Sequence, residues 1–436
     1  MTKGEIDRLG QRIGESKSID SKDLELLQEY RQTFQEPISQ VFNFVLKAAR
    51  RIDRHCIVTY RIKRIDTIIE KLRRFERNDK GRMNLSRMWD IAGCRCIMSV
   101  SSTEKLYQLK DVLLEEYGVD SKVNDHINTP KDSGYRSLHV YVKDKQTQKP
   151  VEIQIRNRSQ HNWATLVEIV DLLYGTKQKE QGATGQLGRF LYLYSRATDL
   201  TNEEFSEMLQ IERKMKVFER MSDVLTKNYL NIRRQWLKQK QYGTFFVITA
   251  NKTRSEILSY PTFKDAENAY YDKYLANADS NIVLTHLSRP DFSQISVAYS
   301  NYVLAMHAFF DDYRDLVGRK IIECIRVNDY YDFFKDFKIY NSNLKYHFRN
   351  LSLEINDINA CLADTSISRN QIHKWQSEIR ERWSLWKKET QDFIRVLAIT
   401  ARGSRVKKWL IRNRIIRMTR AITAGQKEGA LKHRSS

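Results

Sequence analysis

Two carboxylates in this sequence stand at strand-like segments that are surrounded by lysine and arginine. Asp90 opens the segment DIAGCRCI, and Glu152 lies in VEIQIR, where apolar and polar residues alternate. Mg²⁺ prefers one or two carboxylates and completes its shell with water and phosphate oxygens, and basic groups neutralise phosphate charge in a transition state. The pattern therefore fits a magnesium-dependent phosphoryl-transfer site. The alternative is structural, because Asp90 could also cap a turn or pair with an arginine, and a lone strand glutamate usually faces solvent.

The segment KDSGYRSLH, residues 131–139, brings further polar groups to the start of a strand. In RSLHVYV and VEIQIR every second residue is apolar, which is the period of a half-buried strand. Gly134 is expected to let the chain bend sharply, so that the Tyr135 ring faces the site. No Walker-type or kinase-type glycine loop is present. If the two strands pair across their eight-residue connection, their polar residues line one surface: His139, Tyr141, Glu152, Gln154 and Arg156.

A sheet and several helices are needed to hold these groups in place. Apolar residues at helical spacing from Ile62 to Phe75 predict a buried stripe, and the basic residues between them predict either a binding face or a solvated one. The segments AGCRCIMSV, RSLHVYV and VEIQIR predict strands, and a helix ended by Gly118 is predicted between the first two. We therefore predict one α+β domain over residues 38–190.

The remaining chain divides by its pattern into four further parts. Residues 1–37 predict a helical lead-in, and residues 191–239 predict a helical connector. The strand-like segments GTFFVITAN, SEILSYP and NIVLTHLS, with a helical segment between the last two, predict a small second α+β domain over residues 240–320. Residues 321–436 predict a helical and strongly basic C-terminal region.

The composition indicates a polyanionic partner. The 436 residues include 75 Lys and Arg against 54 Asp and Glu, which gives a formal net charge of +21. Nucleotides, RNA, DNA or an anionic membrane surface would suit this excess, although it could also be only a soluble basic surface. Five cysteines without a C-x-x-C pair argue against a zinc site and a disulfide framework. No apolar run resembles a signal peptide or a membrane span, so we expect a cytoplasmic protein.

About half of the excess charge lies at the C-terminal end. Residues 391–436 hold twelve Lys or Arg and two acidic residues, a net charge of +10. The segment RVKKWLIRNRIIRMTR mixes these basic groups with large apolar residues. Such a helix could lie on RNA, on an acidic protein or on a membrane surface. It could equally dock through its apolar stripe and leave a solvated basic face.

Five blocks of the sequence, in this order, resemble those of the RelA/SpoT alarmone synthetases: RIKRIDTIIEKLRR, DIAGCRCI, TPKDSGYRSLH, VEIQIR and QHNWATLVE. Each block alone is weak, but the five together are specific. The resemblance covers roughly residues 38–180 and implies a nucleotidyltransferase-like mixed sheet flanked by helices. It also implies transfer of the β,γ-pyrophosphate of ATP to the 3′-hydroxyl of a guanine nucleotide, GDP or GTP, with Mg²⁺ as the cofactor.

The resemblance also implies roles for individual residues. Asp90 falls at the Mg²⁺-binding aspartate, and Glu152 falls at a carboxylate that is either a second Mg²⁺ ligand or the base for the attacking hydroxyl. The residues implied to bind ATP are Arg61 and Arg95 at the adenine ring and Lys63 and Lys71 at the phosphates. The residues implied to bind the acceptor are Tyr135, stacked on guanine, Lys131 and His139 near its phosphates, and Gln154, which like His161 has no firm role.

The acceptor and the biological role stay open at this point. Long family members carry an N-terminal His-Asp hydrolase domain, but no His-Asp dipeptide occurs here, so we expect synthesis without degradation. Such an enzyme needs tight control, which suits a toxin or defence role with an inhibitory partner or antitoxin. One alternative is a toxin that pyrophosphorylates the 3′ end of tRNA, which the basic C-terminal helix would suit. Another is a non-catalytic RNA- or partner-binding module, against which the retention of Asp90, Glu152 and Tyr135 argues.

Overall fold

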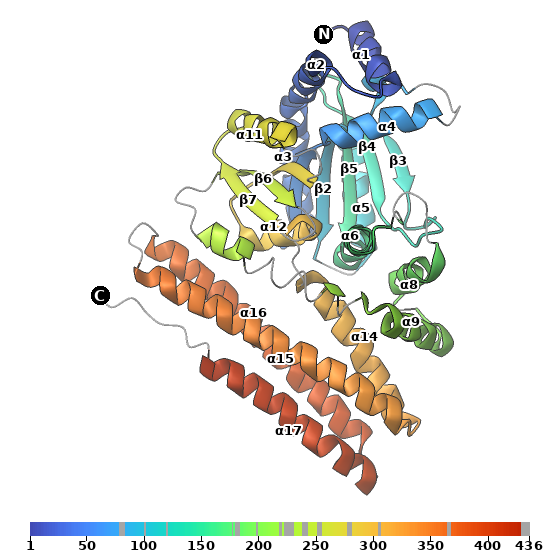
Figure 1. Cartoon of the computed structure of the whole chain (residues 1–436), viewed down its shortest axis with the longest axis vertical. Coiled ribbons are helices and arrows are strands. Elements are labelled where there is room, and N and C mark those ends of the chain that lie inside the picture. The colour runs from blue at the N-terminus through green and yellow to red at the C-terminus, as the bar shows by residue number, and fades with distance from the viewer. Residues whose placement is uncertain are drawn as a thin grey trace. The chain divides into compact units, whose positions relative to one another are not determined.

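The chain folds into two compact units. The first contains residues 1–232 and 241–306, and the second contains residues 233–240 and 307–436 (Figure 1). The computed structural model describes residues 1–77, 83–99, 102–118, 121–176, 178, 184–197, 199–217, 220–221, 231–237, 243–250, 255–276, 281–303, 307–363 and 368–428.

A mixed sheet of eight strands forms the middle of the first unit (Figure 1). The order across the sheet is β3-β4-β5-β2-β1-β8-β6-β7. β2 and β5 run parallel, and the other neighbouring pairs run antiparallel. The predicted mixed sheet is therefore confirmed. The strands are β1 (Ile57–Ile62), β2 (Ala92–Met98), β3 (Lys122–Asp125), β4 (Leu138–Lys143), β5 (Pro150–Asn157), β6 (Phe245–Ala250), β7 (Ser255–Tyr260) and β8 (Asn281–Leu287).

The strands predicted as a separate domain over residues 240–320 instead extend this sheet. β8 pairs antiparallel with β1, from Thr59 opposite Leu287 to Arg61 opposite Thr285. A separate three-stranded domain would leave the edges of both β8 and β1 unpaired, and an unpaired edge exposes backbone N–H and C=O groups. Joining the two edges satisfies those groups. The prediction of a second α+β domain is therefore wrong, because periodicity along a chain does not show which strands pair.

One face of the sheet packs against a continuous hydrophobic core. In the third helix, Val41, Phe42, Val45 and Ala49 recur at helical spacing and are all buried, so this amphipathic pattern directs the helix onto β1 and β2. The helical lead-in predicted over residues 1–37 contributes to the same core. The helices that supply the core are α1 (Lys3–Glu15), α2 (Ser21–Gln32), α3 (Gln35–Ile52), α4 (Ile65–Arg77), α5 (Glu104–Tyr117) and α11 (Phe263–Ala276).

The opposite face of the sheet carries a second group of helices. α6 (Arg158–Tyr174) follows β5 directly and begins with a capping box, in which the Asn157 side chain accepts from the Gln160 N–H and the Gln160 side chain accepts from the Asn157 N–H. α6 contacts β2 and β5, and α12 contacts β1. Further elements of this unit are α8 (Gly185–Ser195), α9 (Asn202–Met215), α12 (Phe292–Ala298), α13 (Ser300–Val303) and the short 3₁₀ helix η1 (Leu85–Arg87).

A buried ion pair joins α2 to α11. The side chains of Arg31 and Glu267 are wholly buried, with Nη1 2.8 Å from Oε1, and Arg31 Nε donates to the Lys63 carbonyl at 2.9 Å. Removing one partner of a buried pair leaves an uncompensated charge and costs about 3 to 5 kcal/mol. Glu267→Ala is therefore expected to lower the free energy of unfolding by that amount in urea denaturation. The double variant Arg31→Met, Glu267→Leu removes both charges and should recover most of the loss; equal stability of the wild type and Glu267→Ala would contradict this account.

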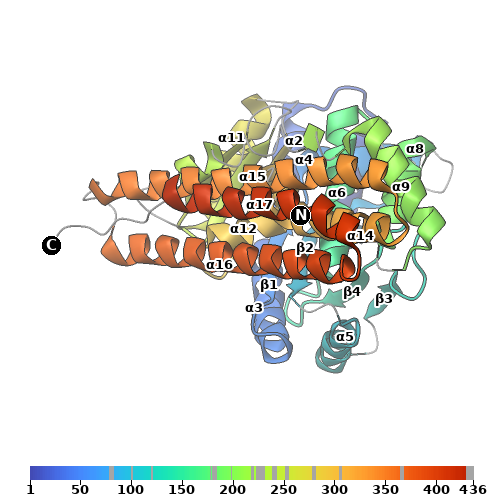
Figure 2. The same cartoon turned by 90° about the horizontal axis from the view of Figure 1, so that it is seen from below.

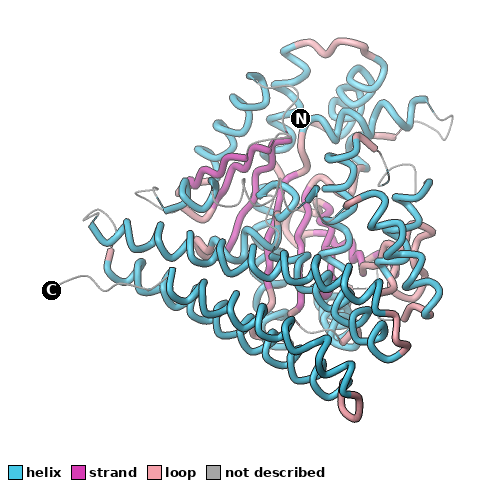
Figure 3. The backbone as a smooth tube through the Cα atoms, turned by 60° about the horizontal axis from the view of Figure 1, so that its bottom comes forward, coloured by secondary structure: helices cyan, strands magenta, loops and turns pink. Residues whose placement is uncertain are grey.

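The described part of the second unit is helical, as Figures 2 and 3 show. α15 contacts each of the other three long helices. Buried aromatic residues, among them Phe333, Phe348 and Trp375, fill the core of this unit. The prediction of a helical C-terminal region is confirmed. No helix among the described residues has the length and apolar character needed to cross a membrane. The elements are α14 (His307–Arg326), α15 (Tyr330–Ala360), η2 (Cys361–Ala363), α16 (Arg369–Thr400) and α17 (Arg405–Glu428).

Candidate active site

Polar residues of four neighbouring strands form two rows across the sheet. Alternate residues of a strand point to opposite faces, so the members of both rows share the face that carries α6, while their apolar neighbours enter the core. The predicted pairing of RSLHVYV with VEIQIR is confirmed, since β4 and β5 are antiparallel neighbours. The first row is Arg61, Gly93, Glu152 and Tyr141, and the second is Arg95, Gln154 and His139, each residue opposite the next.

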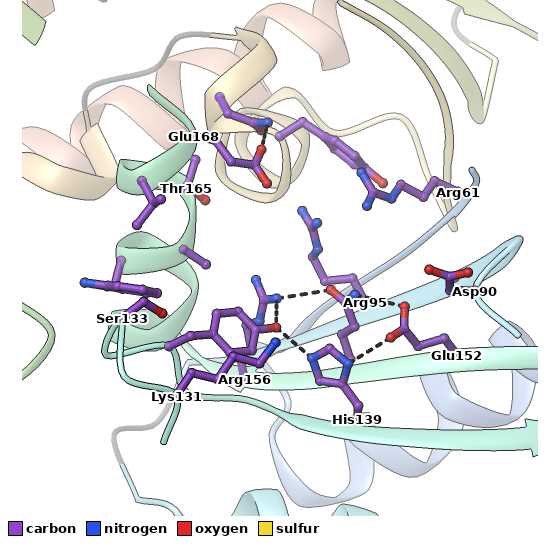
Figure 4. A pocket seen from close by; sticks show the side chains of 18 of the residues that line it. Arg61, Asp90, Arg95, Lys131, Ser133, His139, Glu152, Arg156, Thr165 and Glu168 are labelled. Carbon is purple, nitrogen blue, oxygen red and sulfur yellow. Dashed lines mark hydrogen bonds and ion pairs between the residues drawn. The ribbon is translucent and has the colours of Figure 1, made fainter. Parts of the chain in front are cut away.

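A cavity of about 340 Å³ lies over these rows. Its floor is the sheet, and its walls come from the segment before β4, from α6 and from residues 299–301 (Figure 4). Lys71 is a predicted site residue that does not line the cavity, but its side chain contacts Asp90 at the rim. The other nine predicted site residues all line the cavity: Arg61, Lys63, Asp90, Arg95, Lys131, Tyr135, His139, Glu152 and Gln154.

Asp90 lies between two lysines. Lys63 Nζ is 2.8 Å from its Oδ2, and Lys71 Nζ, from α4, is 2.8 Å from its Oδ1. Burial by itself raises the pKa of Asp90, but the two ammonium groups outweigh burial and lower the pKa below its usual value of 3.8. The same burial lowers the pKa of Lys63 in spite of the nearby carboxylate. Asp90 is therefore ionised at neutral pH, and its partners are lysines rather than the arginine that the structural alternative supposed.

Glu152 accepts three hydrogen bonds on the floor of the cavity. His139 Nδ1 lies 2.8 Å from Oε1, the Tyr141 hydroxyl donates to the same oxygen at 3.0 Å, and Gln154 Nε2 donates to Oε2 at 3.0 Å. Burial would raise the pKa of this carboxyl, but the contacts with His139, Tyr141 and Gln154 lower it to about 2. Burial also opposes the charging of His139, yet the bond to Glu152 raises the His139 pKa. Glu152 is thus a buried, ion-paired carboxylate and not a solvent-facing one.

Tyr135 is held through both its hydroxyl and its ring. The hydroxyl lies 2.6 Å from His139 Nε2 and accepts from Arg156 Nη2 at 2.6 Å (Figure 4). Burial raises the pKa of Tyr135, but the charges of Arg156 and His139 outweigh it and lower the pKa to about 8. Lys131 Nζ and the Arg156 guanidinium carbon lie 5.2 and 5.1 Å from the ring centroid, within cation–π range. A base stacked on this ring would compete with one of these cations.

Gly134 explains how the Tyr135 ring reaches the cavity. Its φ is +89°, which side-chain-bearing residues rarely adopt. A Cβ at this position would also lie 2.8 Å from the Cβ of Ser195 on α8. Only glycine fits both constraints, in agreement with the sharp bend expected from the sequence.

Arg95 is engaged by a segment far along the chain. Its Nη1 donates to the Ala298 carbonyl at 2.6 Å, and its guanidinium carbon lies 5.5 Å from the ring centroid of Tyr299. The Tyr299 hydroxyl is bonded to Thr285 Oγ1 at 2.6 Å, which fixes this ring against β8. Burial and the charge of Arg61 lower the pKa of Arg95 to about 10. This part of the cavity therefore concentrates positive charge, and an anionic ligand would relieve it.

Several cavity residues are not predicted as site residues from the sequence. Trp163 and Glu168 project from α6, and the Asn301 side chain donates a hydrogen bond to the Glu168 carboxylate. Trp163 and Glu168 both belong to the block QHNWATLVE, so the sequence could have identified them as candidate site residues. Tyr299 and Asn301 carry no such signal, because their pattern suggests a different domain. Arg156 is predicted on the polar face but without a role.

His161, like Lys71, is a family position that lies outside the cavity lining. Its side chain is wholly buried, and its Nε2 is 2.9 Å from the Val297 carbonyl. Burial lowers the pKa of this imidazole well below 6.5, so the ring is neutral at neutral pH. His161 therefore ties α6 to the end of α12.

Two of the carboxylates that line the cavity, Asp90 and Glu152, allow its fit to a metal ion to be tested. Within the described ranges, no group of three or more His, Cys, Asp or Glu side chains could hold a metal ion. Asp90 and Glu152 are nevertheless both ionised and both line one cavity. Mg²⁺ is commonly held by one or two carboxylates together with water and phosphate oxygens. This donor set fits Mg²⁺ that arrives with a nucleotide and does not fit an all-protein metal centre.

Known proteins resemble the part of the chain that builds most of this cavity. Residues 60–179 match the family described as "Region found in RelA / SpoT proteins". GTP pyrophosphokinase YwaC of Bacillus subtilis is 34% identical over 113 residues, which are 24% of this chain and 53% of that protein. Uncharacterized protein Rv1366 of Mycobacterium tuberculosis is 30% identical over 119 residues, 27% of this chain and 41% of that protein. The chain thus spans about half the length of the curated relatives it matches.

Similar solved structures include the small alarmone synthetase 1 from Bacillus subtilis bound to pppGpp, with 25% identity, a TM-score of 0.31, and coverage of 43% of this chain and 97% of that one. A GTP pyrophosphokinase family protein from Streptococcus pneumoniae has 23% identity, a TM-score of 0.31, and coverage of 46% and 98%. The family match includes all ten predicted site residues, from Arg61 to Gln154. Residues 60–179 of this chain therefore match the region found in RelA/SpoT proteins, in agreement with the resemblance of the five sequence blocks.

Proposed function

We propose that the chain is an ATP-dependent pyrophosphotransferase that moves the β,γ-pyrophosphate of ATP to the 3′-hydroxyl of GDP or GTP. The observation that carries this proposal is the pair of ionised carboxylates, Asp90 and Glu152, in one cavity with several cationic side chains. Such a cavity suits a metal ion and the phosphates of two nucleotides, and positioning supplies most of the acceleration in phosphoryl-type transfer. The match to a relative named GTP pyrophosphokinase supports the same choice.

Asp90 and Glu152 would hold Mg²⁺, which when bound neutralises charge on the transferring phosphates. The ligand role suits Glu152 better than the base role, since a carboxylate with a pKa of about 2 is a weak proton acceptor at neutral pH. Lys63 and Lys71 keep Asp90 ionised and lie where the ATP phosphates would approach it. Lys131, Tyr135, His139 and Gln154 are proposed to bind the acceptor.

The Tyr135 ring can be tested separately from its hydroxyl. Stacking of a base on an aromatic ring contributes about 1 to 3 kcal/mol, and 1.4 kcal/mol is a factor of ten. Tyr135→Leu is therefore expected to raise the KM for the acceptor roughly ten- to a hundredfold. Tyr135→Phe keeps the ring and should change this KM little. If both variants raise the KM equally, the contribution of Tyr135 comes from its hydroxyl, which positions His139 and Arg156, and not from stacking on the base.

We expect the Arg95 guanidinium to exchange its contact with the Tyr299 ring for a contact with the adenine ring when ATP binds. A cation–π contact of this kind is worth about 1 to 2 kcal/mol when it is desolvated. Tyr299→Leu is therefore expected to lower the KM for ATP about tenfold in steady-state kinetics. Tyr299→Phe keeps the ring and serves as the matched control, while thermal melting checks that both variants fold. An unchanged KM in the folded Tyr299→Leu variant would show that the Tyr299 ring does not compete with ATP.

The acceptor is tested by offering GDP, GTP, AMP and deacylated tRNA in turn, with ATP labelled at the γ-phosphate and Mg²⁺. Label in GDP or GTP supports the proposal. Label in tRNA alone would replace it with the tRNA-modifying toxin, which the basic helix α17 also suits. Transfer to none of the four would leave the non-catalytic binding module.

A further inference from the structure

α17 has two apolar faces, and within the described part of the chain only one of them is buried. Leu410, Ile411, Met418 and Ile422 are buried, and α17 contacts both α15 and α16. Figures 1 and 2 both show α17 running beside α15 within the second unit. The helix therefore docks through an apolar stripe, which is one of the alternatives that the sequence left open.

The second apolar face is exposed. Val406, Trp409 and Ile416 are 59%, 68% and 38% exposed. Their spacing of three and seven residues places them along one side of the helix, because residues three, four and seven apart share a face. Val396 and Ile399, near the end of α16, are also exposed and adjoin the turn at Gly403 that leads into α17. Packing inside the second unit therefore leaves these five residues exposed on α17 and near the end of α16, and we call them together the 396–416 surface.

Charged residues of the segment 393–427, which contains the 396–416 surface, are all basic. Residues 393–427 contain ten Lys or Arg and no Asp or Glu. Arg405, Lys408, Arg412 and Arg417 are exposed on α17 and flank the apolar residues. Long basic side chains can lay their methylene stems along apolar surface and keep their charged ends in a polar layer. The surface thus combines exposed apolar side chains with basic side chains that lie beside them on the same helix.

We propose that the 396–416 surface binds an anionic lipid membrane. A helix with Trp and aliphatic residues flanked by Lys and Arg lies in the interface of a bilayer, where the apolar residues enter the acyl boundary and the basic groups meet anionic headgroups. RNA is the weaker candidate, because phosphates and bases would contact the basic side chains and the Trp409 ring but would leave the exposed aliphatic residues Val396, Ile399, Val406 and Ile416 without an apolar partner. Binding at a surface also agrees with the lack, among the described residues, of a helix that could cross a membrane. The inference does not depend on the proposed transferase activity.

The test uses the full chain and sedimentation with vesicles of phosphatidylcholine alone or mixed with phosphatidylglycerol. Binding is expected only to the mixed vesicles. Val406→Ser combined with Trp409→Ser should weaken it at least about tenfold, because both apolar groups are lost. Leu385→Ser is the matched control, since Leu385 is 50% exposed on α16 of the same unit but outside the surface, and it should bind as the wild type does.

A charge variant and an RNA arm complete the test. Arg405→Gln, Lys408→Gln and Arg412→Gln together should also reduce sedimentation with the mixed vesicles, and more strongly at low salt than at high salt. No vesicle binding by the wild type would overturn the proposal, as would equal binding to both vesicle types. If the Val406→Ser, Trp409→Ser variant binds the mixed vesicles as well as the wild type does, the contact with the membrane is purely electrostatic. That result would also overturn the proposal. Binding of tRNA in place of vesicles would assign this surface to RNA.

Discussion

Asp90→Asn is expected to lower pyrophosphate transfer about a thousandfold, the scale seen when a preorganised electrostatic contact to the transition state is lost. The substitution preserves the shape of the side chain and removes the charge that Lys63 and Lys71 now neutralise. Without this charge, Glu152 is left as the only one of the two carboxylates proposed to hold Mg²⁺. The measurement is the initial rate with labelled ATP at saturating Mg²⁺ and acceptor.

The fold should tolerate this change, because Asp90 and both lysines are about one-fifth exposed. Water can therefore solvate the two ammonium groups that lose their carboxylate partner. A melting temperature near that of the wild type would exclude unfolding as the cause. Asp111→Asn is the matched control, since Asp111 pairs with Lys110 on the exposed side of α5 and should transfer at the wild-type rate. Transfer by Asp90→Asn within a few-fold of the wild type would refute the proposed metal site.

Glu152→Gln is expected to impair both activity and stability. Both carboxylate oxygens of Glu152 accept hydrogen bonds, from His139 and Tyr141 on one side and from Gln154 on the other. An amide has one oxygen, so its NH₂ group would face a donor whichever way it turned. Rotation of the Gln154 amide would not repair this, because its Oε1 already accepts from Arg156. We expect transfer to fall about a thousandfold, as for Asp90, and the free energy of unfolding to fall by about 3 kcal/mol for a lost buried partner.

The pH dependence of the loss in unfolding free energy gives an independent check of the ion pair between Glu152 and His139. Glu152 has its pKa lowered from 4.5 to about 2, so its contribution to stability is fully present above pH 4.5 and disappears as the pH falls toward 2. His139 has its pKa raised from 6.5, so its contribution is full below pH 6.5 and is lost as the pH rises through the raised value. The difference in unfolding free energy between the wild type and Glu152→Gln should therefore be greatest between pH 4.5 and 6.5. A difference that does not vary with pH would contradict the ion pair.

The sequence predicts the local parts of this site well. Alternation in RSLHVYV and VEIQIR predicts that His139, Tyr141, Glu152, Gln154 and Arg156 share a face, and the register of β4 and β5 confirms it. The reason is physical, because a strand with one buried face must alternate and two such strands close in sequence pair readily. The sharp bend at Gly134 is also legible, since glycine is the residue that adopts positive φ at no steric cost.

The sequence does not show which residues far apart along the chain come into contact. The edge of β1 pairs with β8, more than 200 residues away, and this pairing brings Tyr299 against Arg95. The ion pair of Arg31 with Glu267 is equally distant in sequence. Nothing in either local pattern specifies the partner, because each edge strand could pair with any other edge. The consequence for the site is direct: residues 281–303 complete the sheet and one wall of the cavity, although they lie outside the RelA/SpoT region.

The fate of ATP tests the central claim most directly. Transfer of the β,γ-pyrophosphate leaves AMP, whereas transfer of a single phosphate leaves ADP. With ATP labelled at the α-phosphate, GDP or GTP as acceptor and Mg²⁺, the wild-type chain should release one labelled AMP for each acceptor molecule modified, and Asp90→Asn should release almost none. Labelled ADP as the main product, or AMP formed without a modified guanine nucleotide, would contradict pyrophosphate transfer at this cavity.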